Sequence, residues 1–329
     1  MTERLRWGIL APGGIAHAFT NDLELNGFDV RAVGSRSIES ARAFAEEFGI
    51  PNAHGSYEAL AADPEVDVIY VATPHPWHAA RALLAIESGK HVLVEKPFTL
   101  NQAEARLVSD AAAAAGVLVL EAMWTRYLPH MARVREIIAA GTLGEVRTLI
   151  ADHTQRLPLD PAHRINALEL GGGALLDLGI YPISFAWDLF GAPASIQSTA
   201  VLHTTGVDAQ VAVQLGYDDG RIASTLSASN TRGPNRAVVI GTDAYVDIDE
   251  VWYSPTSFRV VSHDGAVLEE FRSEVIGRGM HFQAEALERL VGEGRLDGGD
   301  ILSTEESVAI MGTLDAVRAE IGVRDPGEE

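Results

Sequence analysis

The chain has 329 residues, which is enough for two domains of ordinary size. Its 25 basic and 46 acidic side chains give a net charge of −21, which disfavours nucleic acid and anionic membranes as partners. The lack of cysteine excludes disulfide bonds, thiolate zinc sites, iron–sulfur clusters and thiol catalysis.

The first residues lead directly into an apolar strand pattern and lack the features of a signal peptide. No apolar stretch approaches the length of a membrane span. We therefore expect a cytoplasmic protein.

Strand-like and helix-like patterns alternate over the first 120 residues. Strands are predicted at 5–11, 28–35, 66–72, 91–94 and 117–120. Helices are predicted at 15–23, 37–48, 77–88 and 101–116. Ser37 and Asn101 are the expected N-caps of the second and fourth of these helices, and Gly116 ends the last. This alternation predicts an α/β domain of the Rossmann type, with a doubly wound parallel sheet.

After residue 121 helices are predicted at 129–140, 171–190, 280–291 and 304–321. Strands are predicted at 146–153, 196–203, 209–217, 221–229, 237–240, 245–248 and 258–262. Turn signals separate these strands and predict an antiparallel sheet. We therefore expect a Rossmann domain over residues 1–122. Residues 123–329 should form an α+β domain with a large, mostly antiparallel open sheet, which binds substrate and dimerises.

A glycine-containing turn follows the first predicted strand. Its sequence is Ala11-Pro12-Gly13-Gly14-Ile15-Ala16, which we compare with the dinucleotide-binding pattern Gly-x-Gly-x-x-Gly/Ala. Gly13 lets the backbone approach a diphosphate, whose charge the amides of the helix N-terminus bind. Ala11 replaces the first glycine of the pattern, so an ordinary glycine-rich turn is the alternative.

The end of the second strand decides which dinucleotide is expected. Asp or Glu at this place binds the ribose 2′-hydroxyl of NAD, but this chain has Ser35-Arg36. Arg36 can pair with the 2′-phosphate of NADP, so NADP is favoured over NAD. The alternative is a solvated arginine that starts a helix.

Glu95-Lys96-Pro97 end a predicted parallel strand, at the edge of such a sheet where ligands bind. The Lys96 ammonium can hydrogen-bond a reacting oxygen and stabilise negative charge on it. An ion pair with Glu95 is the alternative.

Asp177 and Tyr181 follow the run Gly171-Gly172-Gly173 and are four residues apart, so a helix places them on one face. Tyr181 could exchange the proton of an alcohol–ketone pair, because a nearby ammonium lowers the pKa of a phenol. Alternatively, Asp177 caps local backbone and Tyr181 belongs to the core.

These motifs together resemble the glucose–fructose oxidoreductase/inositol dehydrogenase (Gfo/Idh/MocA) family over nearly the whole chain. Thr73-Pro74-His75 with His78 is similar to the family's Thr-Pro-x-x-x-His stretch, although His75 stands where Asn is common. The segments 121–126 and 279–285 resemble the branch of dimeric dihydrodiol dehydrogenase and NADP-dependent D-xylose dehydrogenase. Tyr181 occupies a position that is His in many members.

The resemblance implies that Lys96, Asp177 and Tyr181 surround a sugar or polyol hydroxyl, and that Trp124 and Arg126 line the substrate pocket. His153, Arg156 and His163 are further possible substrate contacts. The full expected cofactor set is Ala11, Pro12, Gly13, Gly14, Ile15, Ser35, Arg36, Thr73, Pro74, His75, His78, Glu95 and Lys96. The family also implies a homodimer through the C-terminal sheet. No metal is expected, because the histidines lack metal-ligand spacing.

The sequence thus predicts an NAD(P)-dependent dehydrogenase or reductase acting on the CH–OH group of a sugar, polyol or vicinal diol. Lys96 and Tyr181 would handle the proton and Asp177 would position them. A catalytically silent dinucleotide sensor or structural subunit is one alternative. A sugar–sugar oxidoreductase with tightly bound cofactor is the other.

Overall fold

A computed structural model describes residues 4–324. Residues 1–3, where the sequence was examined for a signal peptide, and residues 325–329 of the expected second domain lie outside the described residues. The chain divides into two compact units, which we call unit 1 (Met1–Trp124 and Val275–Met311) and unit 2 (Thr125–Glu274 and Gly312–Glu329). The sequence-based division at 122/123 assigns everything after it to one domain, whereas by packing the segment Val275–Met311 belongs to unit 1.

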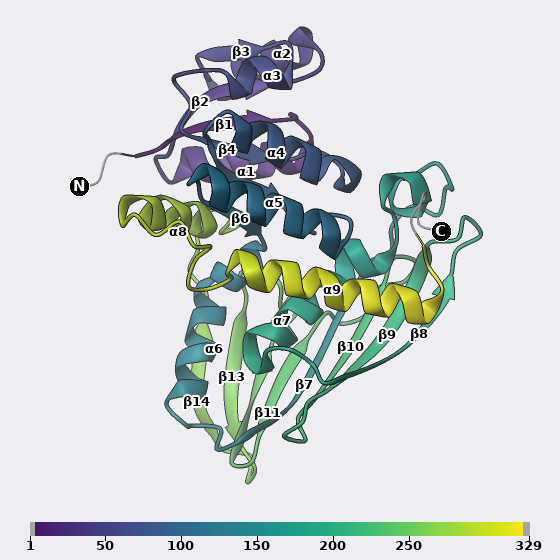
Figure 1. Ribbon diagram of the computed structural model, residues 1–329. Helices are drawn as coiled ribbons and strands as arrows, with labels where there is room; N and C mark the ends of the chain where they lie inside the picture. The colour runs from purple at the N-terminus through teal and green to yellow at the C-terminus, as the bar shows by residue number, and fades with distance from the viewer. Residues whose placement is uncertain (1–3, 325–329) are drawn as a thin grey trace. The chain divides into compact units, whose positions relative to one another are not determined.

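Unit 1 contains a six-stranded parallel sheet in the order β3-β2-β1-β4-β5-β6. Its strands are β1 (Arg6–Leu10), β2 (Asp29–Gly34), β3 (Asn52–His54), β4 (Val68–Val71), β5 (His91–Glu95) and β6 (Val119–Ala122). The helices between them are α1 (Gly14–Leu25), α2 (Ile38–Phe48), α3 (Tyr57–Ala61), α4 (His78–Glu87) and α5 (Gln102–Ala115). Figure 1 shows α4 and α5 in front of the strands. The predicted Rossmann sheet is confirmed.

The caps of α2 and α5 are those predicted. Ser37 accepts the amide of Ser40 at 3.2 Å, and Asn101 accepts the amide of Glu104 at 2.9 Å. Gly116 ends α5 in the left-handed conformation, with φ of 66°. β3 and α3 are not predicted from the sequence, because three and five residues are too short to show a period.

The segment after unit 2 returns to unit 1 and forms α8 (His281–Gly292). Asp22 of α1 is fully buried and accepts the amide of Arg278 at 2.8 Å and that of Met280 at 2.7 Å. Trp7 in β1 donates its indole N–H to Glu288 of α8 at 3.0 Å. These bonds attach a distant part of the chain to the first strand and helix, which no local sequence pattern predicts.

Unit 2 contains an eight-stranded sheet in the order β14-β13-β12-β11-β7-β10-β9-β8. Its strands are β7 (Val146–Thr154), β8 (Ser195–Leu202), β9 (Asp208–Gly216), β10 (Ile222–Ala228), β11 (Ala237–Gly241), β12 (Ala244–Ile248), β13 (Ser257–Ser262) and β14 (Val267–Arg272). β7 and β10 pair in parallel, and the other neighbours pair antiparallel, so the mostly antiparallel sheet is confirmed. β14 is not predicted from the sequence, because Glu269 and Glu270 interrupt its apolar pattern.

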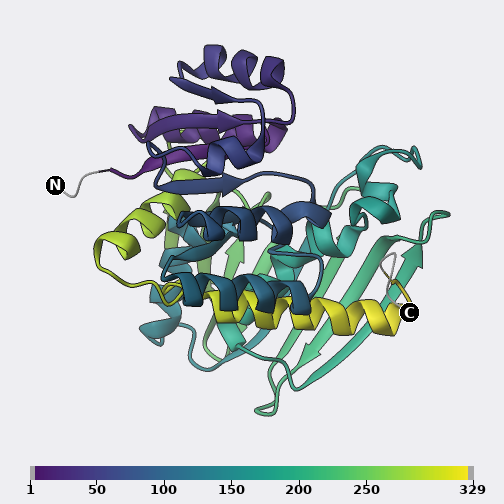
Figure 2. The ribbon, with the colours of Figure 1, turned by 45° about the horizontal axis from the view of Figure 1, so that its top comes forward.

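Helices cover one face of this sheet, as Figures 1 and 2 show for α7 (Ile180–Phe190). α6 (Pro129–Ala139) also belongs to unit 2, and the division between the units falls within α9 (Thr304–Ile321). The predicted helix 171–190 begins later than expected, with a π-helical turn, η5 (Leu175–Gly179), that leads into α7. A π turn contains one more residue than an α turn, which periodicity alone does not reveal.

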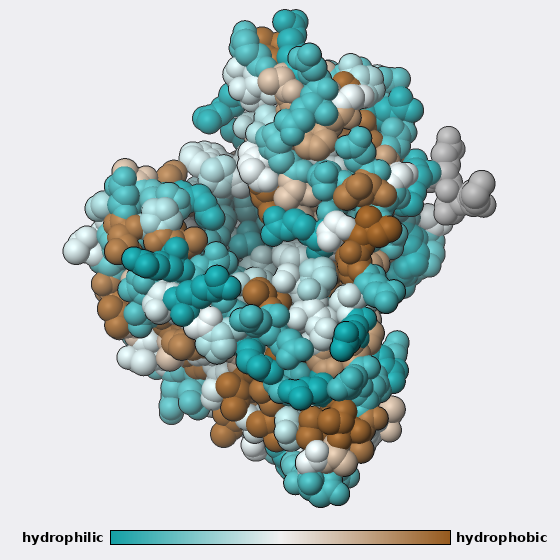
Figure 3. Space-filling view, turned by 180° about the vertical axis from the view of Figure 1, so that it is seen from behind, coloured by the Kyte–Doolittle hydropathy of each residue, from teal (hydrophilic) through white to brown (hydrophobic). Residues whose placement is uncertain are grey.

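The opposite face of the eight-stranded sheet exposes apolar side chains. Ile150 of β7 lies opposite Ser224 of β10, between the exposed Ile222 and Leu226 on the same face. Val201 of β8, which is 56% exposed, extends the row across β9. In Figure 3, a view from behind, brown side chains gather in the lower part of the molecule. We call this set of side chains the outer sheet face.

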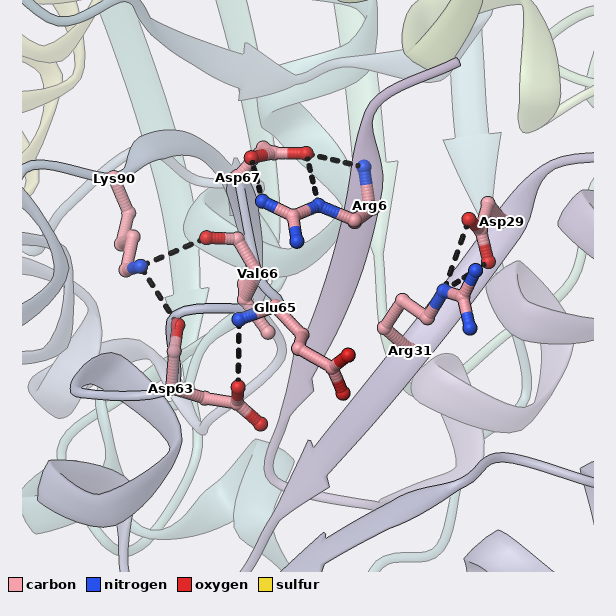
Figure 4. A network of polar contacts seen from close by, with 8 residues as sticks. All are labelled: Arg6, Asp29, Arg31, Asp63, Glu65, Val66, Asp67 and Lys90. Atoms are coloured by element: carbon pink, nitrogen blue, oxygen red, sulfur yellow. Dashed lines mark hydrogen bonds and ion pairs between the residues drawn. The ribbon is translucent and has the colours of Figure 1, made fainter. Parts of the chain in front are cut away.

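The amino ends of the strands in unit 1 are held by charged side chains (Figure 4). Arg6 at the start of β1 donates two bonds, of 2.9 and 2.7 Å, to Asp67 just before β4. Lys90, before β5, donates to the carbonyl oxygens of Asp63 and Val66, both at 2.8 Å. Burial lowers the pKa of Lys90. This edge of the sheet is therefore occupied by its own ion pairs and carbonyl contacts.

No helix in the part of the chain that the structure describes is long and apolar enough to cross a membrane.

We expect Asp22→Ala to destabilise the protein by about 2–4 kcal/mol, because it leaves the buried amides of Arg278 and Met280 without an acceptor. Urea unfolding would measure the change, with Glu24→Ala on an exposed position of the same helix as the control. Equal stability of the two variants would contradict the anchoring role of Asp22.

Candidate functional site

The first group of candidate residues lies in unit 1, at the carboxyl edge of the parallel sheet. β1, β4 and β5 are neighbours, and all their carboxyl ends point to this edge. They are followed by the segments that begin at Ala11, Ala72 and Lys96. The order 3-2-1-4-5-6 reverses direction between β1 and β4, where ligands bind in sheets of this kind.

The turn after β1 has the backbone that a bound dinucleotide needs. Ala11 has φ of 73°, in the left-handed region where glycine is usual, which explains the glycine preference at this place of the pattern. Gly13 is the N-cap of α1, and among the described residues no side chain caps it. A Cβ added to Gly13 or Gly14 would meet nothing within 4 Å, and both glycines are exposed. The open space and uncapped amides fit an anionic diphosphate.

Ser35 and Arg36 follow β2 at the same edge. Ser35 is nearly buried, and its amide donates to the carbonyl of His54 at 3.1 Å. Arg36 is exposed and forms no ion pair with any other residue that the structure describes. Its guanidinium is therefore available for an external anion.

The predicted segment Thr73–His78 is held by its own histidine. His78 is fully buried and places Nε2 at 2.8 Å from the carbonyl oxygen of Thr73 and Nδ1 at 2.7 Å from that of Pro97. Burial lowers the pKa of His78, and the charge of Lys96 acts in the same direction. His78 thus connects the loop after β4 to the loop after β5. His75 is nearly buried, 5.6 Å from the His78 ring, and Pro74 precedes the short helix η1 (His75–Trp77).

Lys96 directly follows β5, and the Lys96–Pro97 peptide bond is cis. Its backbone amide donates to the Glu95 carboxylate at 3.2 Å, and that carboxylate also accepts the hydroxyl of Tyr70 in β4. The buried Glu95 therefore connects β4 to the backbone of Lys96.

Lys96 and Lys90 are the two lysines of the sequence, whereas the other 23 of its 25 basic side chains are arginines. They flank β5, with Lys90 at its amino end and Lys96 at its carboxyl end. A lysine ammonium is a compact charge that can titrate, unlike a guanidinium.

The second group of candidate residues lies in unit 2, where three glycines precede η5. Gly171 has φ of 63°. A Cβ on Gly172 would lie 2.7–2.9 Å from the carbonyl oxygens of Ile165, Ala167 and Arg164. Close packing of backbone on backbone therefore requires glycine at position 172, and the left-handed backbone favours it at 171.

Asp177 lies within η5 and is 5% exposed. Arg164 donates two bonds of 3.3 Å to its carboxylate. Tyr181 follows in the first turn of α7, so the expected spacing of four residues spans a change of helix type.

Tyr181 belongs to an aromatic cluster. The His153 ring lies edge-on to it at 4.8 Å, and Tyr253 lies 5.4 Å away. His153 also stacks on Tyr253 at 3.7 Å. Burial raises the pKa of Tyr253 to about 12, and Tyr181 contributes in the same direction. Tyr253 is therefore a neutral phenol next to Tyr181 at physiological pH.

The structure buries both predicted pocket residues. Trp124 is 5% exposed, with the guanidinium carbon of Arg278 5.8 Å from its ring. Arg126 is 2% exposed, donates to the carbonyl of Ser184 and lies 3.7 Å from Asp188. These contacts favour a supporting role for Arg126 over direct contact with a ligand.

Sequence reasoning missed Arg164, Tyr253 and Asp208, which contact or lie near the residues that it selected. Arg164 is next to His163, which was considered, so the segment was found but not the residue. Asp208 and Tyr253 come from strands and loops far along the chain, and no local motif marks them. Over residues 4–324 no group of three or more histidine and acidic side chains could hold a metal ion.

Both the amino-terminal and the carboxyl-terminal parts of the chain match models of one protein family. Residues 5–123 match the model of an oxidoreductase family with an NAD-binding Rossmann fold, GFO/IDH/MocA. Residues 131–247 match the model of the GFO/IDH/MocA C-terminal domain.

Curated relatives match the chain from end to end. Trans-1,2-dihydrobenzene-1,2-diol dehydrogenase of Mus musculus is 36% identical over 99% of both chains. The enzyme of the same name from Danio rerio is 35% identical over 97% of both.

Solved structures share the fold. A 3-ketoreductase from Actinomadura kijaniata, in complex with NADP and TDP-benzene, has a TM-score of 0.84 and 27% identity over 98% of this chain and 99% of that one. An aldose–aldose oxidoreductase from Caulobacter crescentus, complexed with glycerol, has a TM-score of 0.88 and 24% identity over 97% of both.

The glycines of the two groups should respond differently to alanine. Gly172→Ala is expected to cost about 1–3 kcal/mol of stability, because its Cβ meets three carbonyl oxygens. Gly13→Ala should leave stability nearly unchanged but weaken dinucleotide binding on the order of tenfold, because the methyl fills the space for the diphosphate.

Thermal unfolding and titration of protein fluorescence with NADP would separate the two effects. Unchanged NADP affinity of Gly13→Ala would place the diphosphate elsewhere.

Proposed function

The chain belongs to the GFO/IDH/MocA family of NAD(P)-binding oxidoreductases, and we propose that it interconverts the hydroxyl and carbonyl groups of a sugar, polyol or vicinal diol. The observation that carries the proposal is the place of Lys96. It follows β5 at the carboxyl edge of the sheet, the edge at which the open Ala11–Gly14 turn follows β1. Relatives named as diol dehydrogenases support the substrate class.

The dinucleotide would be held by the turn from Ala11 to Ile15, with its first-turn amides on the diphosphate. Ser35 and Arg36 would bind the adenosine ribose, and the exposed guanidinium of Arg36 favours NADP. Thr73, Pro74, His75, Glu95 and Lys96 would border the nicotinamide. His78, which is buried, would act by connecting the Thr73 and Pro97 loops. When bound, the nicotinamide gives or takes the hydride.

Lys96 and Tyr181 would handle the charge and proton at the reacting oxygen. The Lys96 ammonium donates a hydrogen bond to that oxygen and stabilises its negative charge. Tyr181 takes the hydroxyl proton in oxidation and returns it in reduction. Burial raises the pKa of the neighbouring Tyr253 to about 12, so its phenol keeps its proton and does not compete as a base.

Asp177 would position the reacting groups. Its carboxylate is buried and is held by the half-exposed Arg164, so its direction is set within unit 2. Trp124 and Arg126 would shape the substrate pocket. The buried ion pair of Arg126 with Asp188 supports a role in holding the pocket residues.

The proposed division of roles follows from these assignments, with residues 1–122 for the dinucleotide and 123–329 for the substrate and for dimerisation, although the segment Val275–Met311 packs with unit 1. The outer sheet face, with Ile150, Ile222 and Leu226 about half exposed, supports a homodimer through unit 2. Burying these side chains against a second copy would remove apolar area from water.

Lys96→Ala should lower kcat by about 10²–10³-fold with NADP affinity largely retained, because it removes a donor that acts on charge at the reacting oxygen. Absorbance of the reduced nicotinamide over a panel of aldoses, polyols and diols would measure turnover. Lys90→Ala, at the other end of β5, is the matched control and should stay within about threefold. Near-normal turnover of Lys96→Ala would refute the assigned role.

Arg36→Asp should shift the ratio of kcat/KM for NADP over that for NAD towards NAD by about 100-fold. The arginine–phosphate bond is lost, and the carboxylate can accept a ribose hydroxyl. Arg31→Asp makes the same charge change near the start of β2 and should leave the ratio unaltered. If the ratio is equal in wild type and Arg36→Asp, the 2′-phosphate is bound by other residues.

A further inference from the structure

We propose that Asp208 is a positioning residue, which holds the start of the segment 173–181 and through it sets the places of Asp177 and Tyr181. The inference rests on the proposed function only for the roles of those two residues. Asp208 is the first residue of β9 and is 2% exposed, so its carboxylate is committed to contacts inside unit 2.

The Asp208 carboxylate binds the backbone at the point where η5 begins. Its Oδ2 accepts the amide of Leu175, the first residue of η5, at 2.6 Å. The amide of Ala174 also faces the carboxylate. Amides in the first turn of a helix have no acceptor within the helix, so a side chain that accepts them fixes where the helix starts.

The other carboxylate oxygen lies where Gly173 would carry a side chain. Gly173 has φ of 120°, and a Cβ there would be 2.3 Å from Oδ1 of Asp208. The third glycine of the motif thus leaves room for this carboxylate. The carbonyl of Gly173 in turn accepts the amide of Asp177 at 3.4 Å. Asp208 therefore lies against Gly173 and bonds Leu175, at the start of the short stretch that leads into Asp177.

A π-helical turn makes this anchor more important than an ordinary cap. The turn inserts one residue relative to an α-helix, and the residues after it are rotated accordingly. Its first residue must therefore be fixed for Asp177 and Tyr181 to keep their directions. A Cβ on Gly179, which ends the turn, would lie 3.2 Å from the Ser227 hydroxyl in β10, so the end of the turn packs closely against the sheet to which Asp208 bonds its start.

The charges around Asp208 come from α9. The positive charge of the Arg318 guanidinium lowers the pKa of Asp208, and the same guanidinium donates a hydrogen bond to Asp315 at 2.8 Å. Leu202 of β8 pairs with Asp208, and His203 in the adjoining turn bonds Thr205 at 2.9 Å. On the other side of β9, Ser229 follows β10 and bonds the backbone of Ala209. Arg318 is thus the cation that favours the ionised form.

Burial raises the pKa of Asp208 to about 7, although the amide bonds and Arg318 oppose this. At pH values between the usual carboxyl pKa and about 7, Asp208 is therefore protonated in the folded protein and ionised in the unfolded chain. This proton favours folding at acidic pH, and the contribution is lost as the pH rises through about 7. The ionised carboxylate, in contrast, accepts the Leu175 amide more strongly.

Hydrogen–deuterium exchange of the intact protein tests the anchor without requiring turnover. Asp208→Ala should speed exchange of the amides in 174–181 by about tenfold or more, since a charge-assisted bond is removed. Asp208→Asn keeps an acceptor and should stay within about threefold of wild type at acidic pH. The control is Asp63→Ala, which removes a carboxylate that accepts the amide of Glu65 in unit 1.

The pH dependence separates positioning from general stability. In wild type, protection of the Leu175 amide, corrected for its intrinsic rate, and kcat should both rise as the pH passes through about 7. Asp208→Asn should show neither rise, with NADP affinity unchanged. If Asp208→Ala does not fold, this comparison decides the question by itself.

Two results would overturn the proposal. One is that the amides of 174–181 exchange at the wild-type rate in Asp208→Ala, as they are expected to do in the control Asp63→Ala. The other is an Asp208→Asn variant that retains the wild-type rise of protection near pH 7. If no sugar, polyol or diol is turned over, the proposed function fails, while the exchange data still decide the role of Asp208.

Discussion

The parallel pairing of six strands is the constraint on which unit 1 depends. It places every carboxyl end at one edge, so a turn after β1, an arginine after β2 and a lysine after β5 reach the same side although they are up to 85 residues apart in sequence. The opposite edge is closed by its own bonds, such as those of Lys90 and the Arg6–Asp67 pair. One edge is thus stabilised internally, while the other keeps open space around Gly13.

Much of the fold could be predicted because its elements have strong periods and caps. Ser37 and Asn101 mark helix starts through bonds that depend on nearby residues alone. What sequence reasoning missed is either short, as in β3, or determined by distant contacts. The returning segment Val275–Met311 is bound by the buried Asp22, which in sequence is an ordinary acidic residue of an amphipathic helix.

The candidate site shows the same division between local and distant causes. Lys96 could be selected because its position after a buried strand is itself informative. The glycines at 171–173 can be recognised as a motif in the sequence. The reason for glycine there cannot, because the atoms that leave no room for a side chain are carbonyl oxygens of residues 164–167 and the carboxylate of Asp208. Arg126 is predicted to line the substrate pocket, and its burial follows from contacts with Ser184 and Asp188 that the sequence does not indicate.

Because unit 1 is built from two separate segments of the chain, it cannot be completed early in synthesis. The chain leaves the ribosome with its amino end first, so α8 emerges only after every strand of unit 2. Until then Asp22 lacks the amides of Arg278 and Met280, and the Trp7 indole lacks the carboxylate of Glu288. The six strands can pair during translation, but their final packing waits for residues that are synthesised nearly last. Unit 2 waits even longer, because its last segment begins at Gly312, directly after the end of unit 1.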